Sequence, residues 1–109
     1  MAYFLYQVAY TPESWAMQAE SVPDVRHRVQ ATIENLGGSI EALWYAFGEY
    51  DVVAIIKFPD NISMAATAIA FAAGGALKAA KTTPLMTVEE GMEAMKKAGK
   101  ASGIYTPPT

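Results

Sequence analysis

Segments rich in aromatic and branched residues alternate along the chain with segments whose apolar residues recur at helical spacing. The first kind predicts β-strands and the second predicts α-helices. The expected strands are residues 2–10, 39–47, 51–58 and 76–83. The expected helices are residues 12–20, a second helix that starts at 21–24 and stops at 37–38, residues 62–73 and residues 88–98, with Val22, Val25 and Val29 in the apolar stripe of the second helix.

Capping and turn residues mark where these segments begin and end. Thr11 followed by Pro12 is typical of a helix start, because threonine caps free backbone amides and proline needs no N–H partner there. Thr87 and Glu90 have the spacing of a capping box for the last helix. Pro84 is expected to end the fourth strand, and Gly99 is expected to end the last helix.

The elements follow the order β-α-β-β-α-β, with an early break in the first helical region and an additional helix after the last strand. This order predicts a ferredoxin-like α+β fold, in which helices cover one face of a four-stranded antiparallel sheet. The chain of 109 residues suits a single domain. We expect that domain over residues 1–100 and a flexible tail over residues 101–109.

The predicted sheet is apolar on both faces. In the first strand, Phe4, Tyr6 and Val8 alternate with Leu5 and other mainly apolar residues. A sheet with helices on one face normally presents polar residues on the other. The pattern therefore predicts a homodimer or higher homo-oligomer that pairs sheet against sheet. The alternative is a barrel-like monomer whose last helix folds under its own sheet.

Composition narrows the classes of function. Charged residues make up 17% of the chain and hydrophobic residues 52%, a balance that excludes intrinsic disorder. The net charge of −3 makes a nucleic-acid partner unexpected. No apolar run is long enough to span a bilayer, and no basic region precedes the first apolar stretch, so we expect a cytoplasmic protein. The chain has no cysteine and one histidine, which gives no support to a metal site or a nucleophilic triad.

The turn Gly48-Glu49-Tyr50-Asp51 and the segment Lys81-Thr82-Thr83-Pro84-Leu85 carry a resemblance to a known family. With the residues around them, they resemble the GYD domain family over about residues 3–95. The resemblance implies a ferredoxin-like domain that dimerises as an α+β barrel. It implies little about function, because the family is known mainly as a domain without an assigned activity.

Two wider groups with the same architecture supply two hypotheses of function. Cofactor-independent enzymes of the dimeric α+β barrel class, with isomerase, cyclase or monooxygenase activity, keep a pocket between sheet and helices. By that likeness we expect a small-molecule-binding protein, with or without catalytic activity, for a small apolar or aromatic substrate, and we expect no cofactor. The alternative is a non-catalytic effector-sensing or assembly module similar to the ligand-binding domain of leucine-responsive-type regulators. Fold likeness alone is a weak argument for either.

The turn and the one histidine supply the candidate catalytic residues. Gly48 is expected to provide a positive φ, and Asp51 to accept hydrogen bonds from nearby amides. The functional alternative places Tyr50 and Asp51 at a pocket mouth as ligand or proton-transfer groups. His27 is expected to face solvent, and it becomes a candidate general base only if its helix is rotated.

Polar and aromatic residues of the strands supply the candidate ligand-binding residues. Gln7 interrupts an apolar strand face and is either a structural link or a pocket group. Lys81 and Thr82 fall on opposite faces of the fourth strand. Asp51 and Glu41 are the expected structural partners of a lysine buried at an interface or pocket. Trp44 belongs to the core or interface, or to the wall of a pocket for a flat molecule.

The helix over residues 62–73 carries nearly all small side chains. Such a helix either packs very close to the sheet or leaves a space beside it. Gly74 and Gly75 follow its C-terminal end, so they do not form a phosphate-binding loop, which requires a helix N-terminus.

Overall fold

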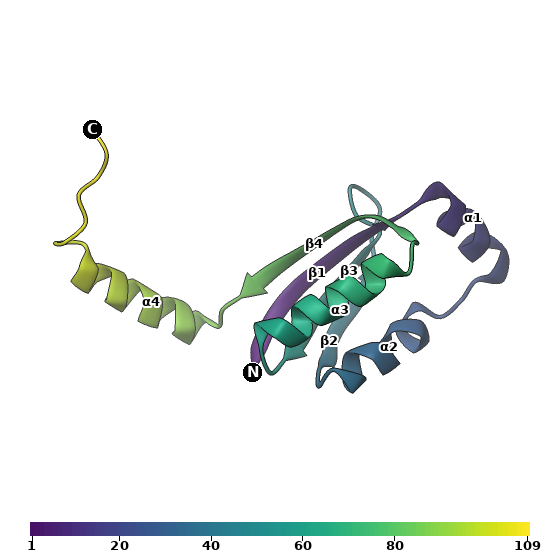
Figure 1. Cartoon of the computed structure of the whole chain (residues 1–109), viewed down its shortest axis with the longest axis horizontal. Coiled ribbons are helices and arrows are strands. Elements are labelled where there is room, and N and C mark those ends of the chain that lie inside the picture. Colours follow the sequence, from purple (N-terminus) through teal and green to yellow (C-terminus); the bar gives the residue numbers. More distant parts are fainter.

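The computed structural model describes residues 1–109 and shows the expected alternation of strands and helices (Figure 1). The strands are β1 (Ala2–Tyr10), β2 (Ser39–Tyr45), β3 (Val52–Phe58) and β4 (Leu77–Leu85). The helices are α1 (Pro12–Ser21), α2 (Val25–Asn35), α3 (Asn61–Ala73) and α4 (Val88–Ala101). No helix is both long enough and apolar enough to cross a bilayer.

The strands form one antiparallel sheet in the order β2-β3-β1-β4. This order, with β1 and β3 in the centre, is that of the ferredoxin-like fold, and the predicted fold class is confirmed. The helix α2 packs on β2, and α3 packs on β3 and β4, so both cover the same face of the sheet (Figure 1). α4 extends past the end of the sheet and covers neither face.

The core lies between the sheet and the two covering helices. Alternate residues of β1 and β3 point into it, and Ile33 of α2 and Met64 of α3 close it from the other side. Phe58 and Ile56 are 0% and 1% exposed. The strand residues in this core are Phe4, Tyr6, Val8, Tyr10, Val52, Ala54, Ile56 and Phe58.

The other face of the sheet carries a second set of apolar side chains with no layer above them. Its rows follow the strand register: Trp44, Val53, Gln7 and Lys81 form one row across all four strands. Leu5 and Ile55 lie in the next row. These side chains range from half-buried to exposed, and Trp44 is 66% exposed. We call this the open face.

The helices begin where their capping residues predict. The Thr11 side chain accepts a hydrogen bond from the N–H of Ser14, with Pro12 in the first turn. At α4 both hydrogen bonds of the capping box between Thr87 and Glu90 are present. α2 ends before Gly37, whose φ of 85° lies in the left-handed region that glycine adopts without strain.

Several predicted boundaries were wrong. Val22 is not in the stripe of the second helix; it follows α1 as its C-cap, with a left-handed φ of 47°. Pro84 lies inside β4, which an edge strand permits because one side of it makes no ladder hydrogen bonds. Gly99 lies inside α4, since a helical glycine costs only about 1 kcal/mol. Gly48 does not adopt a positive φ, so the conformation of its turn does not require glycine.

Candidate functional site

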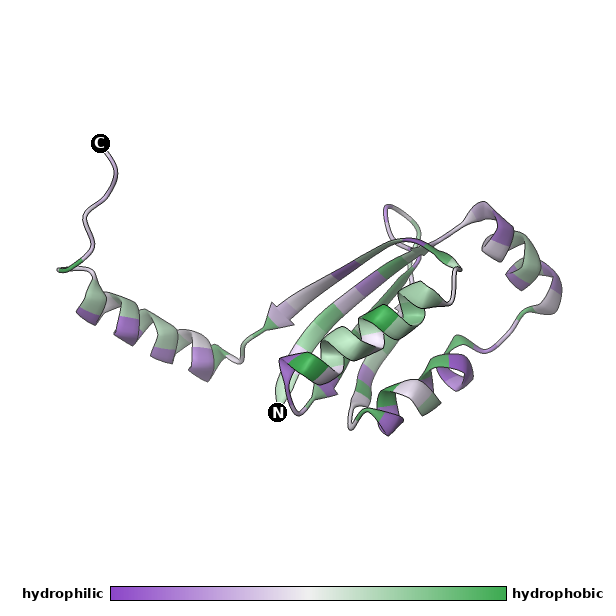
Figure 2. Cartoon of the chain, viewed as in Figure 1, coloured by the Kyte–Doolittle hydropathy of each residue, from purple (hydrophilic) through white to green (hydrophobic).

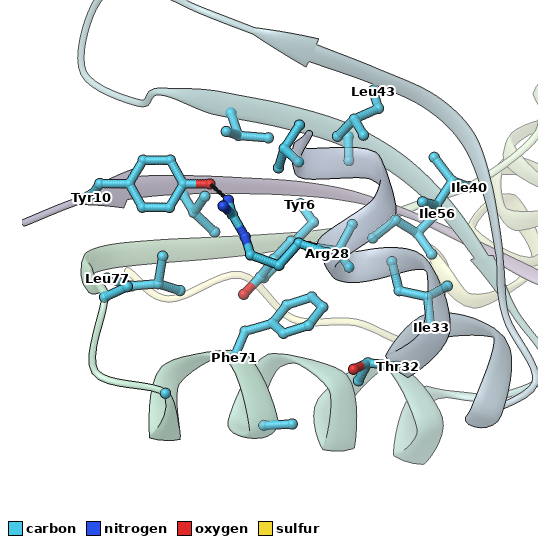
Figure 3. A pocket seen from close by; sticks show the side chains of 18 residues that line it. Tyr6, Tyr10, Arg28, Thr32, Ile33, Ile40, Leu43, Ile56, Phe71 and Leu77 are labelled. Carbon is cyan, nitrogen blue, oxygen red and sulfur yellow. Dashed lines mark hydrogen bonds between the residues drawn. The ribbon is translucent and has the colours of Figure 1, made fainter. Parts of the chain in front are cut away.

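A cavity of about 330 Å³ lies between the covered face of the sheet and the helices α2 and α3 (Figure 3). Hydrophobic residues make up 15 of the 18 that line it. The walls come from β1, β2, β3, α2 and the end of α3 with the start of β4. The labelled side chains in Figure 3 are Tyr6, Tyr10, Arg28, Thr32, Ile33, Ile40, Leu43, Ile56, Phe71 and Leu77.

The cavity exists because the two covering helices pack on different strands and one of them carries small side chains. α2 lies over β2 at one side of the sheet, while α3 lies over β3 and β4. On the cavity side, α3 and the turn after it present Ala70, Gly74 and Ala76. Side chains this short cannot fill the space above the central strands. The small side chains at the end of this helix therefore form part of the cavity wall, next to Phe71 and Leu77.

One end of the cavity is polar and carries its one positive charge. Arg28 of α2 donates a hydrogen bond from Nη2 to the hydroxyl oxygen of Tyr10, at 2.8 Å (Figure 3). The Arg28 guanidinium carbon also lies 5.8 Å from the centre of the Tyr10 ring. The guanidinium has further N–H donors beyond the one used for Tyr10. It can therefore bind an oxygen of a ligand while it keeps its contact with the protein.

Deeper in the cavity, the hydroxyl of Tyr6 is buried and has no hydrogen-bond partner. Its ring lies against that of Phe71, with centres 6.1 Å apart. Buried polar groups in proteins are almost always paired, and an unpaired one costs about 1–3 kcal/mol. A ligand oxygen placed beside Tyr6 would accept this hydrogen bond and remove that cost.

Both cavity phenols are held in their protonated form. Burial, and then the neighbouring Tyr10, raises the pKa of Tyr6 to about 12. Burial also raises the pKa of Tyr10, against the opposing effect of the Arg28 charge. At neutral pH each phenol can therefore donate a hydrogen bond, and neither serves as a base.

The turn at Gly48–Asp51 lies at the end of the sheet, outside this cavity. The Asp51 carboxylate accepts hydrogen bonds from the N–H of Tyr10 at 2.9 Å and from the indole N–H of Trp15 at 3.1 Å. The backbone N–H of Asp51 donates to the carbonyl of Val8 at 2.7 Å. Asp51 thus ties the turn to β1 and to α1. The partners of its carboxylate are N–H groups, and the expected lysine partner was wrong.

The candidate catalytic residues are not gathered around the cavity. Tyr50 and Asp51 are half-buried in the turn, and Asp51 and Gly48 line a separate groove beside α1. His27 is exposed on α2, as expected, near the N-cap Asp24. The structure brings together no group of three or more His, Cys, Asp and Glu side chains that could hold a metal ion.

The candidate ligand-binding residues divide between the two faces of the sheet. Gln7, Trp44 and Lys81 share one row of the open face. Thr82 lies opposite Tyr6 on the covered side of β4, but it is exposed and does not line the cavity. Three of these residues therefore lie on the face that we expect another subunit to cover; Gln7 and Lys81 are on neighbouring strands, whereas Trp44 is on the far edge strand.

The cavity residues Tyr6 and Arg28 were missed as functional candidates. The sequence held a signal for each. Tyr6 is a hydroxyl-bearing residue between Phe4 and Val8 on an otherwise apolar strand face, where a partner is needed. Arg28 lies three residues after Val25 and so falls on the same side of its helix.

Comparisons with known proteins agree with the fold. A family model described as the GYD domain matches residues 4–95. The crystal structure of MtbAldR superposes with a TM-score of 0.53 and 11% sequence identity, over 79% of this chain. The match covers 53% of MtbAldR, so this chain spans about half the length of that protein. At that identity the likeness concerns the fold alone. A search of curated proteins gives no match.

Proposed function

The chain belongs to the GYD domain family, and from its cavity we propose that it binds a flat, apolar small molecule that carries an oxygen acceptor. The observation that carries this proposal is the buried Tyr6 hydroxyl, which has no partner in a cavity lined almost entirely by hydrocarbon. Pockets of about 300–1,000 Å³ with few polar groups are typical of small-molecule sites.

Two polar groups of the cavity, the Tyr6 hydroxyl and the Arg28 guanidinium, define the ligand's chemistry. Tyr6 is a neutral donor, so it favours a carbonyl, carboxylate or ether oxygen. Arg28 adds a positive charge near Tyr10 and favours a negatively charged oxygen. Apolar walls suit an aromatic or alicyclic body between these groups.

A sensing role is the form of this function that the contacts support best. Arg28 binds the Tyr10 hydroxyl, the Tyr10 ring packs edge-on against Trp15 at 5.2 Å, and Tyr10 and Trp15 both donate to Asp51. A ligand that moved Arg28 away from Tyr10 would change this series of contacts as far as the turn at Gly48–Asp51. Cofactor-independent catalysis is the second candidate, supported by a Tyr6 donor that could polarise a carbonyl.

Self-association belongs to the same proposal. The open face presents Leu5, Ile55 and Trp44 to solvent, and packing against a second copy would remove them from water. A cytoplasmic setting, which we expect from a sequence without cysteine, is also part of the proposal. Native mass spectrometry of gently purified protein tests the oligomer and reveals any retained small molecule in one measurement.

The binding site is tested with matched probes: naphthalene, 1-acetylnaphthalene and 1-naphthoate. We expect the two oxygen-bearing probes to bind about tenfold more tightly than naphthalene, as one buried hydrogen bond provides. Tyr6→Phe should remove most of that preference for 1-acetylnaphthalene and leave naphthalene binding unchanged. Arg28→Gln should act mainly on 1-naphthoate. Calorimetry or NMR titration measures each affinity.

Tyr3→Phe is the matched control, because it makes the same substitution on the same strand but on the open face. Equal affinity of all three probes for the wild type and both tyrosine variants would contradict the proposed site. Turnover of a bound ketone that Tyr6→Phe abolishes would favour the catalytic candidate over the sensing one.

A further inference from the structure

The helix α4 is an exposed arm with no partner within its own chain. None of its residues is buried, and it lies beyond one end of the sheet (Figure 1). The radius of gyration is 17.6 Å, whereas a compact chain of this length has about 13 Å. Val88, Met92 and Met95 recur at helical spacing and are exposed, so one side of α4 is an unpaired apolar stripe.

A groove lies at the opposite end of the sheet, between α1 and the turn at Gly48–Asp51. It is lined by Trp15, Gln18, Ala19, Val22, Pro23, Tyr45, Ala46, Phe47, Gly48 and Asp51. The side chain of Phe47 is 104% exposed, and that of Val22 is 78% exposed. Large apolar side chains are exposed mainly at two places on this chain: this groove with its surroundings, and α4 with the tail. In Figure 2, hydrophilic and more apolar residues alternate along α4.

The charges of the two surfaces bear on how α4 would be seated. α4 carries Glu89, Glu90 and Glu93 in its first half and Lys96, Lys97 and Lys100 in its second half, so the helix has no net charge. Asp51 lines the groove and Glu49 lies in the adjacent turn, whereas neither Glu13 nor Glu20 of α1 lines it. Charge therefore favours a seating in which the second half of α4 lies next to the turn.

The topology brings the two surfaces together in a two-fold dimer. β4 runs from the end of the sheet near α1 to the end where α4 departs. When two open faces pack with their strands antiparallel, the α4 end of each subunit lies over the α1 end of the other. Each α4 then runs beside the partner's groove, and both contacts are equivalent by symmetry.

The area of the interface also calls for this contact. Four strands that lie about 4.8 Å apart and rise about 3.3 Å per residue give the open face an area of roughly 500 Å². A stable interface buries about 800 Å² per partner. One side of α4, about 21 Å long and roughly 10 Å wide, together with the matching groove raises the area to about 900 Å² per subunit.

We propose that α4 of each subunit docks through Val88, Met92 and Met95 into the groove formed by Trp15, Val22 and Phe47 of a second copy. This inference rests on the sheet-to-sheet dimer proposed above and goes beyond it. α4 is then an exchanged arm that holds the turn and α1 of the partner. Because Trp15 and Asp51 connect that groove to Tyr10, the arm also contacts the elements that lead to the cavity.

The two tryptophans report the two contacts separately. In the Trp44→Phe variant, Trp15 alone reports on the groove; in Trp15→Phe, Trp44 alone reports on the open face. We expect acrylamide quenching of both to fall at least twofold as concentration raises the mass from monomer to dimer. Adding Met92→Glu with Met95→Glu should restore the quenching of Trp15.

Two outcomes would overturn the proposal, and they differ. If the mass doubles and Trp44 is protected while Trp15 quenching stays constant, the sheet dimer exists without the exchanged arm. If the protein stays monomeric with Trp44 protected, α4 covers its own sheet and the dimer itself is wrong.

A mixing experiment tests the exchange directly. Met92→Glu with Met95→Glu damages the arm, and Phe47→Glu damages the groove, so each homodimer loses both contacts. A heterodimer of the two keeps one intact contact. We expect each variant alone to raise the dimer Kd at least tenfold, and the mixture to dimerise more tightly than either.

Ile69→Glu is the control, since Ile69 is exposed on α3 away from both surfaces. It should leave the dimer Kd unchanged. A Phe47→Glu protein that dimerises like the wild type, or a mixture that dimerises no better than its components, would overturn the exchanged arm and leave the sheet dimer standing. Circular dichroism confirms that each variant is folded.

Discussion

The two faces of the sheet have nearly the same composition and very different surroundings. On the covered face, Ile56 and Phe58 are fully buried under α2 and α3. On the open face, Ile55 and Leu5 occupy the equivalent positions one residue away and have no layer above them. The difference shows that an apolar strand face predicts a packing partner without identifying it. Which face lies under the helices of the same chain is decided by how those helices pack.

The largest effect is expected from a pair of neighbouring substitutions on β3. Ile56→Ala should lower the free energy of unfolding by about 2–5 kcal/mol at every protein concentration, because it leaves a hole in the core. Ile55→Ala should cost roughly 1 kcal/mol in the monomer and more when the protein dimerises. Urea unfolding at low and high protein concentration measures both. Equal, concentration-independent costs would remove the distinction between the faces.

A second comparison sets two glycines against each other. A Cβ at Gly38 would lie 2.4 Å from the ring of Phe58, which is fully buried, so Gly38→Ala should cost about 2–3 kcal/mol. A Cβ at Gly48 meets nothing within 4 Å, so Gly48→Ala should change stability by less than about 0.5 kcal/mol. Thermal unfolding checks both, and a large cost at Gly48 would show that the turn needs glycine.

The third prediction concerns the link at the end of the sheet. Asp51→Ala removes the acceptor for the N–H groups of Tyr10 and Trp15 and should lower stability by about 1–2 kcal/mol. Asp51→Asn keeps one carbonyl acceptor and should cost about half as much. Chemical denaturation gives the two values. If both variants are as stable as the wild type, Asp51 does not hold the turn to β1 and α1.

The smallest effect has the opposite sign. Tyr6→Phe removes a buried hydroxyl without a partner, so the ligand-free protein should gain about 1 kcal/mol. Tyr3→Phe on the open face should be neutral. A loss of stability in Tyr6→Phe would mean that the hydroxyl already has a partner, and the cavity would then lack its free donor.

The same tyrosine predicts a dependence on pH. Its pKa is about 12 in the folded protein and 10 in its ordinary state, so the unfolded chain loses the proton first as pH rises. The contribution of Tyr6 to stability should be constant below pH 10 and should be lost between pH 10 and 12. Tyr6→Phe should reduce that loss. Tyr10 accounts for a remaining decline, because burial raises its pKa as well.

The sequence predicted the fold well and the site poorly. Element order, the caps at Thr11 and Thr87, and the exposure of His27 followed from local patterns, which depend on neighbours in the chain. The polar lining of the cavity did not follow, because Tyr6 and Arg28 are 22 positions apart and come to line one cavity only through packing. The catalytic roles of Tyr50, Asp51 and His27 remain predictions.

The sequence by itself determined that this chain has a four-stranded α+β fold with two apolar sheet faces, because strand alternation and helix caps act over a few residues. Only the tertiary structure decided which face α2 and α3 cover and where they leave a space. It also decided that α4 lies beyond the sheet, uncovered. The physical reason is that side-chain volumes meet across elements distant in sequence, and the space left between them is a property of the packed whole.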